Sequence, residues 1–242
     1  MIVASDPGPT APPRRRRLSR RGRLTVLIVA LMLVSIAAVP IIAHWWRPHY
    51  RPSLHADESY GVDVSHYQGS IDWPKVAADG IDFAYIKSTE AGDWVDETFA
   101  TNWEGARAAG LDVGAYHFFT FCRTGADQAA NFLRVVPDDA DLPPAVDLEF
   151  PNNCSQRPSK EAFQRELRVF LDTVEAELGQ PVLLYVEDDF DARYDILATF
   201  PGATWDRNLW GRPDGERWTF WQCSDVAQVD GIDGGVDLDV RR

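Results

Sequence analysis

The sequence predicts an α/β fold: an irregular (β/α) TIM-like barrel with a β-rich C-terminal closure, preceded by one N-terminal transmembrane helix. Strand-like runs alternate with helical runs from about residue 60 onward, which is typical of a mainly parallel sheet with right-handed crossovers. Candidate strands after residue 203 follow one another too closely for long crossover helices. An uncharged stretch over residues 24–43 predicts the transmembrane helix.

The N-terminal segment has the features of a membrane anchor. As a helix, residues 24–43 would cross the roughly 30 Å hydrocarbon core of a bilayer. Seven arginines precede this stretch, and Trp45 and Trp46 follow it, so the positive-inside rule places the N-terminus in the cytosol. We expect a basic cytosolic tail over 1–23 and a signal-anchor over 24–46. The alternative is a cleaved signal peptide, whose apolar core is usually shorter and which would leave a secreted protein. Both place the remaining chain outside the cytoplasm, in the periplasm or extracellular space.

Charge is unevenly divided along the chain. Residues 1–56 carry a formal charge of +8 and residues 57–242 carry −21. An acidic body repels nucleic acid, so no nucleic-acid partner is expected. Apolar residues make up 45% and charged residues 25% of the chain, which excludes disordered, collagen-like and disulfide-scaffold proteins. We expect one folded domain that is monomeric.

The segment 47–59 contains two prolines and no apolar period, which predicts a linker before a domain over 60–242. Within this domain the clearest helix is predicted at 159–178, where apolar residues recur every three or four positions before Gly179. A second helix is predicted at 126–135, after the capping-box pattern of Thr124 and Asp127. Strands are predicted at 61–65, 82–88, 111–119, 144–150, 182–186, 207–210, 217–222 and 235–240.

The length of the domain predicts an abbreviated barrel. A full eightfold (β/α) barrel needs about 250 residues, whereas residues 57–242 number 186. In parallel barrels the catalytic groups lie at the C-terminal ends of the strands. The acidic residues at such positions are Asp63, Glu90, Asp147, Glu149 and Asp237.

Asp147 and Glu149 are the strongest candidates for catalysis. They flank Leu148 in an otherwise apolar strand, so strand alternation places both carboxylates on one face. Two acids in a partly desolvated site raise the pKa of one of them, which yields the protonated acid beside an anion that glycoside cleavage requires. The alternative is that 37 acidic residues produce such a pattern by chance.

Other polar and aromatic residues give weaker signals. Asp63 ends the first predicted strand, where an aspartate can also serve a turn. Tyr116 and His117 are strand neighbours, so only one of them points inward, and a lone histidine is more often structural. Aromatic rings can stack on sugars, although the core is expected to take most of the domain's seven tryptophans. The aromatic candidates near strand ends are Trp94, Tyr185, Trp210 and Trp221.

The sequence has no recognisable metal or cofactor motif. Three of the five histidines lie in residues 1–56, and none forms an H-x-x-x-H pair. Phosphate-loop, G-x-S-x-G and dinucleotide motifs are absent from the sequence. We therefore predict a hydrolase that acts through carboxylates without a metal or cofactor. Cys122 and Cys154 each follow a strand and are the expected disulfide in an oxidising compartment, which leaves Cys223 unpaired.

A series of motifs runs in order from about Tyr60 to Val240: GVDVSHYQGSIDW, YIKSTEAGDWVDETFATNW, AGLDVGAYHFF, AVDLEF, LLYV, FWQCSD and GGVDLD. With these motifs the chain resembles the glycoside hydrolase family 25 muramidases. These lysozymes cut the β-1,4 bond between N-acetylmuramic acid and N-acetylglucosamine in peptidoglycan. The resemblance implies a family 25 catalytic domain over 60–242, with peptidoglycan glycan strands as its partner.

The resemblance also implies roles for individual residues. By its position in the motifs, Glu149 is the general acid and Asp147 the assisting carboxylate. Asp63 and Asp237 match the family's two further acidic cleft residues. The residues that match its cleft tyrosines or lie in its groove motifs are Tyr116, Tyr185, Glu90 and Trp221.

The sequence departs from the family pattern at the rim and the closing strand. Family members often have Tyr where Cys223 stands, Thr where Val186 stands and Asn where Asp239 stands. Our preferred mechanism is substrate assistance, in which the N-acetyl oxygen attacks the anomeric carbon while Asp147 orients it. The alternatives are a membrane-tethered, non-catalytic peptidoglycan-binding module and a lysozyme-like barrel that acts on chitin.

Overall fold

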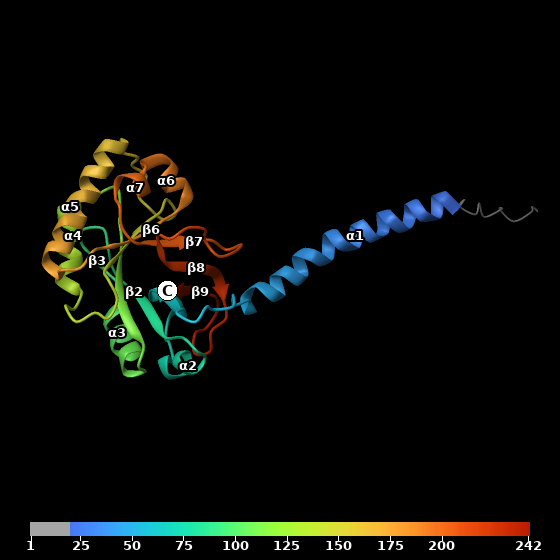
Figure 1. Ribbon diagram of the computed structural model, residues 1–242, viewed down its shortest axis with the longest axis horizontal. Coiled ribbons are helices and arrows are strands. Elements are labelled where there is room, and N and C mark those ends of the chain that lie inside the picture. Colours follow the sequence, from blue (N-terminus) through green and yellow to red (C-terminus); the bar gives the residue numbers. More distant parts are fainter. Residues whose placement is uncertain (1–19) are drawn as a thin grey trace, which may run out of the picture. The chain divides into compact units, whose positions relative to one another are not determined.

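The computed structural model describes residues 20–242 (Figure 1). The chain divides into two compact units, and the second covers Trp46–Arg242. Of the predicted basic tail, residues 1–19 lie outside the described part. Helix α1 (Arg20–Trp46) confirms a helix over the predicted signal-anchor. Within the described residues, however, no helix is long and apolar enough to span a membrane. The structure therefore does not support the predicted membrane crossing.

The second unit is a mixed α/β fold around a closed eight-stranded barrel (Figure 1). The strand order is β1-β9-β8-β7-β6-β5-β4-β2, and a further pairing of β1 with β2 closes the ring. Neighbouring strands are parallel except at β9, which runs antiparallel to both β8 and β1. This confirms the predicted irregular barrel with its β-rich closure. The strands are β1 (Ser59–Val64), β2 (Phe83–Glu90), β4 (Asp112–Phe118), β5 (Ala145–Leu148), β6 (Leu183–Val186), β7 (Thr204–Arg207), β8 (Trp218–Ala227) and β9 (Val236–Arg241), with the short β3 (Trp94–Val95) paired to the end of β2.

The predicted helices form, and their ends follow local capping rules. The Ser159 hydroxyl accepts a hydrogen bond from the Ala162 N–H, and Gly179 ends the same helix with a left-handed φ of 68°. The Thr124 hydroxyl likewise accepts from the Asp127 N–H. Residues 208–235, which are all described, contain no helix, as their spacing predicted. The helices of the second unit are α2 (Trp73–Ala78), α3 (Phe99–Ala108), α4 (Gly125–Val135), α5 (Lys160–Leu178), α6 (Asp188–Tyr194) and α7 (Ile196–Thr199), with the 3-10 turns η1 (Arg47–His49) and η2 (His66–Gln68).

Two apolar cores hold the unit together. The outer core lies between the barrel and its helices, where residues such as Phe170 of α5 are fully buried. The inner core fills the barrel at the N-terminal ends of the parallel strands with Phe83, Tyr85, Trp205 and Phe220. Within this group the ring centroids of Tyr85 and Trp205 lie 4.7 Å apart. One end of the barrel is thereby closed to water.

The expected linker 47–59 packs against the barrel. The Arg47 guanidinium pairs with Asp225 at 3.0 Å, and the Gln228 N–H donates to the Pro48 carbonyl at 2.7 Å. A composition rich in proline and polar residues did not reveal these contacts, because single ion pairs and backbone bonds leave no periodic signal. Further contacts are those of Arg51 with Asp79, the Tyr60 hydroxyl with the Pro52 carbonyl, and Arg212 with Glu58.

The three cysteines lie as the sequence predicted. Cys122, after β4, and Cys154, after β5, form a disulfide with a Cα–Cα distance of 6.2 Å. Because β4 and β5 are neighbours in the barrel, the bridge joins two loops at one rim. Cys223 on β8 is a free, buried thiol.

Candidate active site

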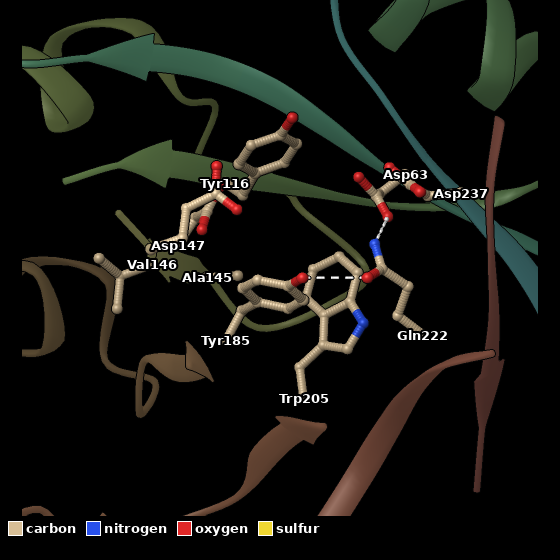
Figure 2. Close-up of a pocket in the computed structure, with 10 residues that line it drawn as sticks. Asp63, Tyr116, Ala145, Val146, Asp147, Tyr185, Trp205, Gln222 and Asp237 are labelled. Atoms are coloured by element: carbon tan, nitrogen blue, oxygen red, sulfur yellow. Dashed lines mark hydrogen bonds between the residues drawn. The ribbon is translucent and has the colours of Figure 1, made fainter. Parts of the chain in front are cut away.

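One pocket opens at the C-terminal ends of the parallel strands and brings most of the predicted site residues together (Figure 2). Asp63 and Asp237 face each other across the β1–β9 pair, because they are register partners. Across the pocket lie Tyr116 of β4 and Asp147 of β5 (Figure 2). The other residues that line the pocket are Ala145, Val146, Glu149, Tyr185, Trp205 and Gln222.

A short hydrogen-bond chain fixes one wall of the pocket (Figure 2). The Tyr185 hydroxyl donates to Gln222 Oε1 at 3.0 Å, and Gln222 Nε2 donates to Asp63 Oδ2 at 3.3 Å. Because the amide donates at one end and accepts at the other, it has one orientation only. The chain therefore holds the Asp63 carboxyl group in place.

Asp239 supports Asp63 from beneath the pocket. Its side chain is 0% exposed, and its Oδ1 accepts a hydrogen bond from Trp205 Nε1 at 2.8 Å. The Asp63 and Asp239 carboxyl groups lie within reach of each other, so one of these two buried groups carries a proton. Burial is the main reason why the pKa of each group lies well above its usual range, and the charge of a neighbouring carboxylate adds to it.

The pair Asp147 and Glu149 is also shifted toward the protonated form. Burial raises the pKa of Glu149 to about 7, and the nearby Glu187 carboxylate adds to this effect. Burial and the Glu149 carboxylate raise the pKa of Asp147 well above its usual range. The ammonium group of Lys87 acts in the opposite direction on both acids. A carboxyl group with a pKa near 7 can donate a proton at neutral pH.

A second hollow continues the pocket along the rim. It shares five residues with the pocket, among them Asp63 and Glu149, and extends to Lys87, Glu90 and Tyr67. Lys87 is 7% exposed, and its Nζ lies 2.7 Å from Glu90 Oε2. The predicted groove residue Glu90 therefore lines this extension and not the pocket itself. We call the pocket together with this extension the acid groove.

Two predicted sugar contacts lie elsewhere. Trp221 is 2% exposed, and its Nε1 donates to the Asn208 carbonyl, so it supports the wall and does not line the acid groove. Trp210 is 93% exposed, but it lines a separate hollow with Leu184 and Val186 of β6. The side chains of Leu184 and Val186 point away from the barrel interior, because they alternate along β6 with the pocket residue Tyr185. Trp221 and Trp210 therefore do not lie with the predicted acids, and their predicted role in substrate binding stays a prediction.

His117 has the structural role that the sequence favoured. It is fully buried outside the barrel, where its ring stacks on Phe170 with centroids 5.0 Å apart. Nδ1 lies 2.8 Å from Thr89 Oγ1, and Nε2 lies 3.2 Å from Gln128 Oε1. Burial lowers its pKa to about 3, so the ring is neutral. Its neighbour Tyr116 points into the pocket.

Sequence reasoning missed several residues of the site. Trp205 was overlooked because the strand in this region was predicted at 207–210, whereas β7 covers Thr204–Arg207. Lys87 and Gln222 stand in quoted motifs, but nothing in a motif indicates that a lysine is buried beside two acids. Glu187 follows β6 directly, and its position after a strand was the available signal. In the part of the chain that the structure describes, no three His, Cys, Asp or Glu residues are grouped so as to hold a metal ion.

Comparisons with known proteins agree with this geometry. The model of the family described as "Glycosyl hydrolases family 25" matches residues 62–232. The uncharacterized protein YegX of Escherichia coli strain K12 is 33% identical over 255 residues, which cover 93% of this chain and 92% of that protein. Residues 57–242 are 186 of the 242 residues, which is less than the 93% of the chain that the match covers. The similarity to YegX therefore extends into the N-terminal segment.

Two further relatives carry functional names. Lysozyme M1 of Streptomyces globisporus is 32% identical over 194 residues, which cover 73% of this chain and 65% of that protein. The solved structure of a family 25 glycosyl hydrolase from Bacillus anthracis matches with a TM-score of 0.72 at 35% identity. That match covers 80% of this chain and 93% of the other.

The buried carboxyl groups predict how stability depends on pH. Burial and the Asp63 carboxylate raise the pKa of Asp237 from its ordinary 3.8 to about 9. The folded protein therefore holds a proton that the unfolded chain releases, and this contribution to stability is lost as pH rises between about 4 and about 9. Asp237→Asn should flatten the fall of the unfolding free energy over this range, measured by urea denaturation. Asp138→Asn, at an exposed site, is the charge-matched control. Parallel curves for wild type and Asp237→Asn would contradict the assignment.

Proposed function

Because the chain belongs to the glycosyl hydrolases family 25 and is therefore a glycoside hydrolase, we propose that it is a peptidoglycan muramidase, or lysozyme. Its substrate is the β-1,4 bond between N-acetylmuramic acid and N-acetylglucosamine in the bacterial cell wall. The observation that carries the proposal is the acid pair Asp147 and Glu149 at the end of β5, inside a pocket at the catalytic end of the barrel. Relatives named lysozyme support the choice of substrate.

Glu149 is the proposed general acid, which protonates the glycosidic oxygen as the bond breaks. A pKa of about 7 keeps a large share of this group protonated at neutral pH, while it can still release its proton readily. Burial and the Glu187 carboxylate together cause this shift. The pocket thus prepares the acid through burial and a neighbouring charge.

Asp147 is the proposed assisting carboxyl group. Among the described residues, its buried Oδ1 has no hydrogen-bond partner, and a polar group of the substrate can therefore fill that place. An N-acetyl amide fits, since substrate assistance requires its oxygen to be directed at the anomeric carbon. Tyr116 lines the pocket beside Asp147 and would complete the surroundings of the amide.

Asp63 and Asp237 are proposed to bind the sugar. The pKa of about 9 leaves Asp237 protonated at neutral pH, so it can donate a hydrogen bond to a sugar oxygen. Asp63 is shifted in the same direction, but it is paired with Asp239 and would accept a hydrogen bond from a sugar hydroxyl group. The Gln222 amide holds Asp63 in a fixed position for this contact. A non-catalytic binding module remains the alternative, and a third possibility is hydrolysis of chitin.

Replacement of the acid tests the proposal most directly. A form of the protein that begins at residue 46 is incubated with purified peptidoglycan, and the released fragments are analysed by mass spectrometry. We expect disaccharide-peptides with a reducing N-acetylmuramic acid end. Glu149→Gln should lower the rate roughly 10²- to 10⁴-fold, the usual contribution of a general acid. Wall material that binds the wild-type protein but stays intact would establish the non-catalytic binding module. Digestion of chitin faster than of peptidoglycan would identify chitin as the substrate.

The influence of Glu187 on Glu149 predicts a shift in the pH–rate profile. The Glu187 carboxylate raises the pKa of Glu149, so its removal lowers that pKa. Glu187→Gln should therefore move the alkaline limb of kcat/KM to lower pH and leave the rate on the acidic plateau unchanged. Asp189→Asn should move the limb in the same direction by less, because Asp189 is the weaker influence. A limb that stays in place in Glu187→Gln would argue against Glu149 as the acid.

Attachment to a membrane is proposed from the sequence alone. The uncharged stretch 24–43 and its arginine flank support a signal-anchor that holds the enzyme outside the cytoplasm. In a bacterial host, the full chain should stay with the membrane pellet after an alkaline carbonate wash, whereas a form exported without residues 1–45 should be released. Release of both forms would refute the anchor. A mature N-terminus near Ala43 in the released protein would identify a cleaved signal peptide.

A further inference from the structure

The acid groove ends at the exposed aromatic ring of Tyr67, which has no part in the function proposed above. From Glu149 and Asp63 the groove passes Lys87 and Glu90 and reaches Tyr67 and Gln68 of η2. The Tyr67 side chain is 75% exposed, although it lines a groove whose other aromatic groups are largely buried. An exposed tyrosine on a surface is common, so the case for a binding role depends on how this ring is held.

A row of aromatic rings backs Tyr67. The His66 and Tyr67 ring centroids lie 4.2 Å apart with an interplanar angle of 35°. Behind His66 lies Trp94, whose ring meets the imidazole edge-on at a centroid distance of 5.4 Å. Lys87 Nζ lies 5.2 Å from the Trp94 centroid, so this row connects with the charged group beside the catalytic acids.

Hydrogen bonds fix the turn that carries Tyr67. The Ser65 hydroxyl accepts from the Tyr67 N–H, and the Ser65 N–H donates to Gln68 Oε1 at 2.8 Å, a complete capping box around a turn of three residues. Gly69 ends the turn with a φ of 63°, which a residue with a Cβ adopts only with strain. The backbone of Tyr67 is thus set before any ligand arrives.

His66 is fixed as firmly as the turn. Its backbone N–H and its Nδ1 lie 2.9 Å and 3.0 Å from Asp96 Oδ2. The Asp96 carboxylate is itself buried and accepts two hydrogen bonds from Thr98 on its other oxygen. Tyr67 therefore stands on a fixed turn beside a fixed imidazole ring, so binding a ligand restricts only the two side-chain torsions of Tyr67.

We propose that Tyr67 is a stacking platform for a pyranose ring of the glycan strand, one or more sugars away from the bond that is cut. The flat apolar face of an N-acetylhexosamine matches an exposed aromatic ring, while its hydroxyl and amide groups match the polar groove between Tyr67 and the acids. Because the acid groove runs without a break from the acids to Tyr67, the glycan strand that occupies the active site is also the one that reaches Tyr67. The inference rests on the proposed muramidase function and adds a binding subsite to it.

The test is the dependence of kinetics on chain length. Peptidoglycan oligosaccharides from disaccharide to octasaccharide are compared as substrates of the wild-type protein, Tyr67→Ala and Tyr67→Phe. For long substrates, Tyr67→Ala should raise KM roughly 3- to 10-fold with kcat unchanged, the range expected for one lost aromatic stacking contact. For the shortest substrate that is cleaved, all three proteins should be alike. Tyr67→Phe should behave as wild type, because stacking does not need the hydroxyl group.

Two outcomes would overturn the platform. One is a KM of Tyr67→Ala that equals the wild-type value at every length, and the other is an equal loss at every length, which indicates a structural role. Calorimetric titration of the same oligosaccharides into Glu149→Gln, with and without Tyr67→Ala, measures the platform independently of catalysis. If the wild-type protein cleaves nothing, the muramidase proposal fails, while a loss of binding on Tyr67→Ala would still support the platform. Equal binding by both forms would refute it.

Discussion

The constraint on which the rest of this structure depends is the burial of carboxyl groups at one end of a barrel whose other end is filled with aromatic rings. Phe83, Tyr85, Trp205 and Phe220 exclude water from the N-terminal end of the strands. The acids above them therefore face solvent on one side only, and burial is the largest cause of their raised pKa values. A barrel with a hydrated interior would leave these carboxyl groups ionised and without a proton to donate.

The carboxyl groups are tolerated because they share protons and because rigid donors hold them. Asp63 and Asp239 share a proton, while Trp205 and Gln222 supply hydrogen bonds from the neighbouring wall. Trp205 thus belongs to both the aromatic filling and the polar network. Its ring excludes water from below, and its N–H stabilises a carboxylate that has no access to water.

The sequence predicted those features that leave a periodic or positional signal. Strand alternation placed Asp147 and Glu149 in one pocket, and capping residues located both long helices of the barrel. Contacts between segments far apart leave no such signal, which is why the docking of residues 47–59 was missed. The short β7 was predicted three residues late, because its apolar run is too brief to fix a boundary, and Trp205 was missed with it. Trp221 was misplaced because the register of β8 determines which face is buried, and a motif does not contain that register.

Protonation of the buried acids also affects how the negatively charged domain can approach an acidic polymer. A domain with a formal charge of −21 should repel the acidic polymers of a cell wall. That count, however, treats every carboxyl group as ionised, and it includes the buried acids of the pocket. Because burial raises their pKa values, these groups are shifted toward the neutral form, and the pocket is less negative than the sequence suggests. Lys87 offsets part of the charge that remains on Glu149 and Glu90. The burial that prepares the proposed general acid therefore also lowers the electrostatic barrier to the proposed substrate, an anionic glycan strand.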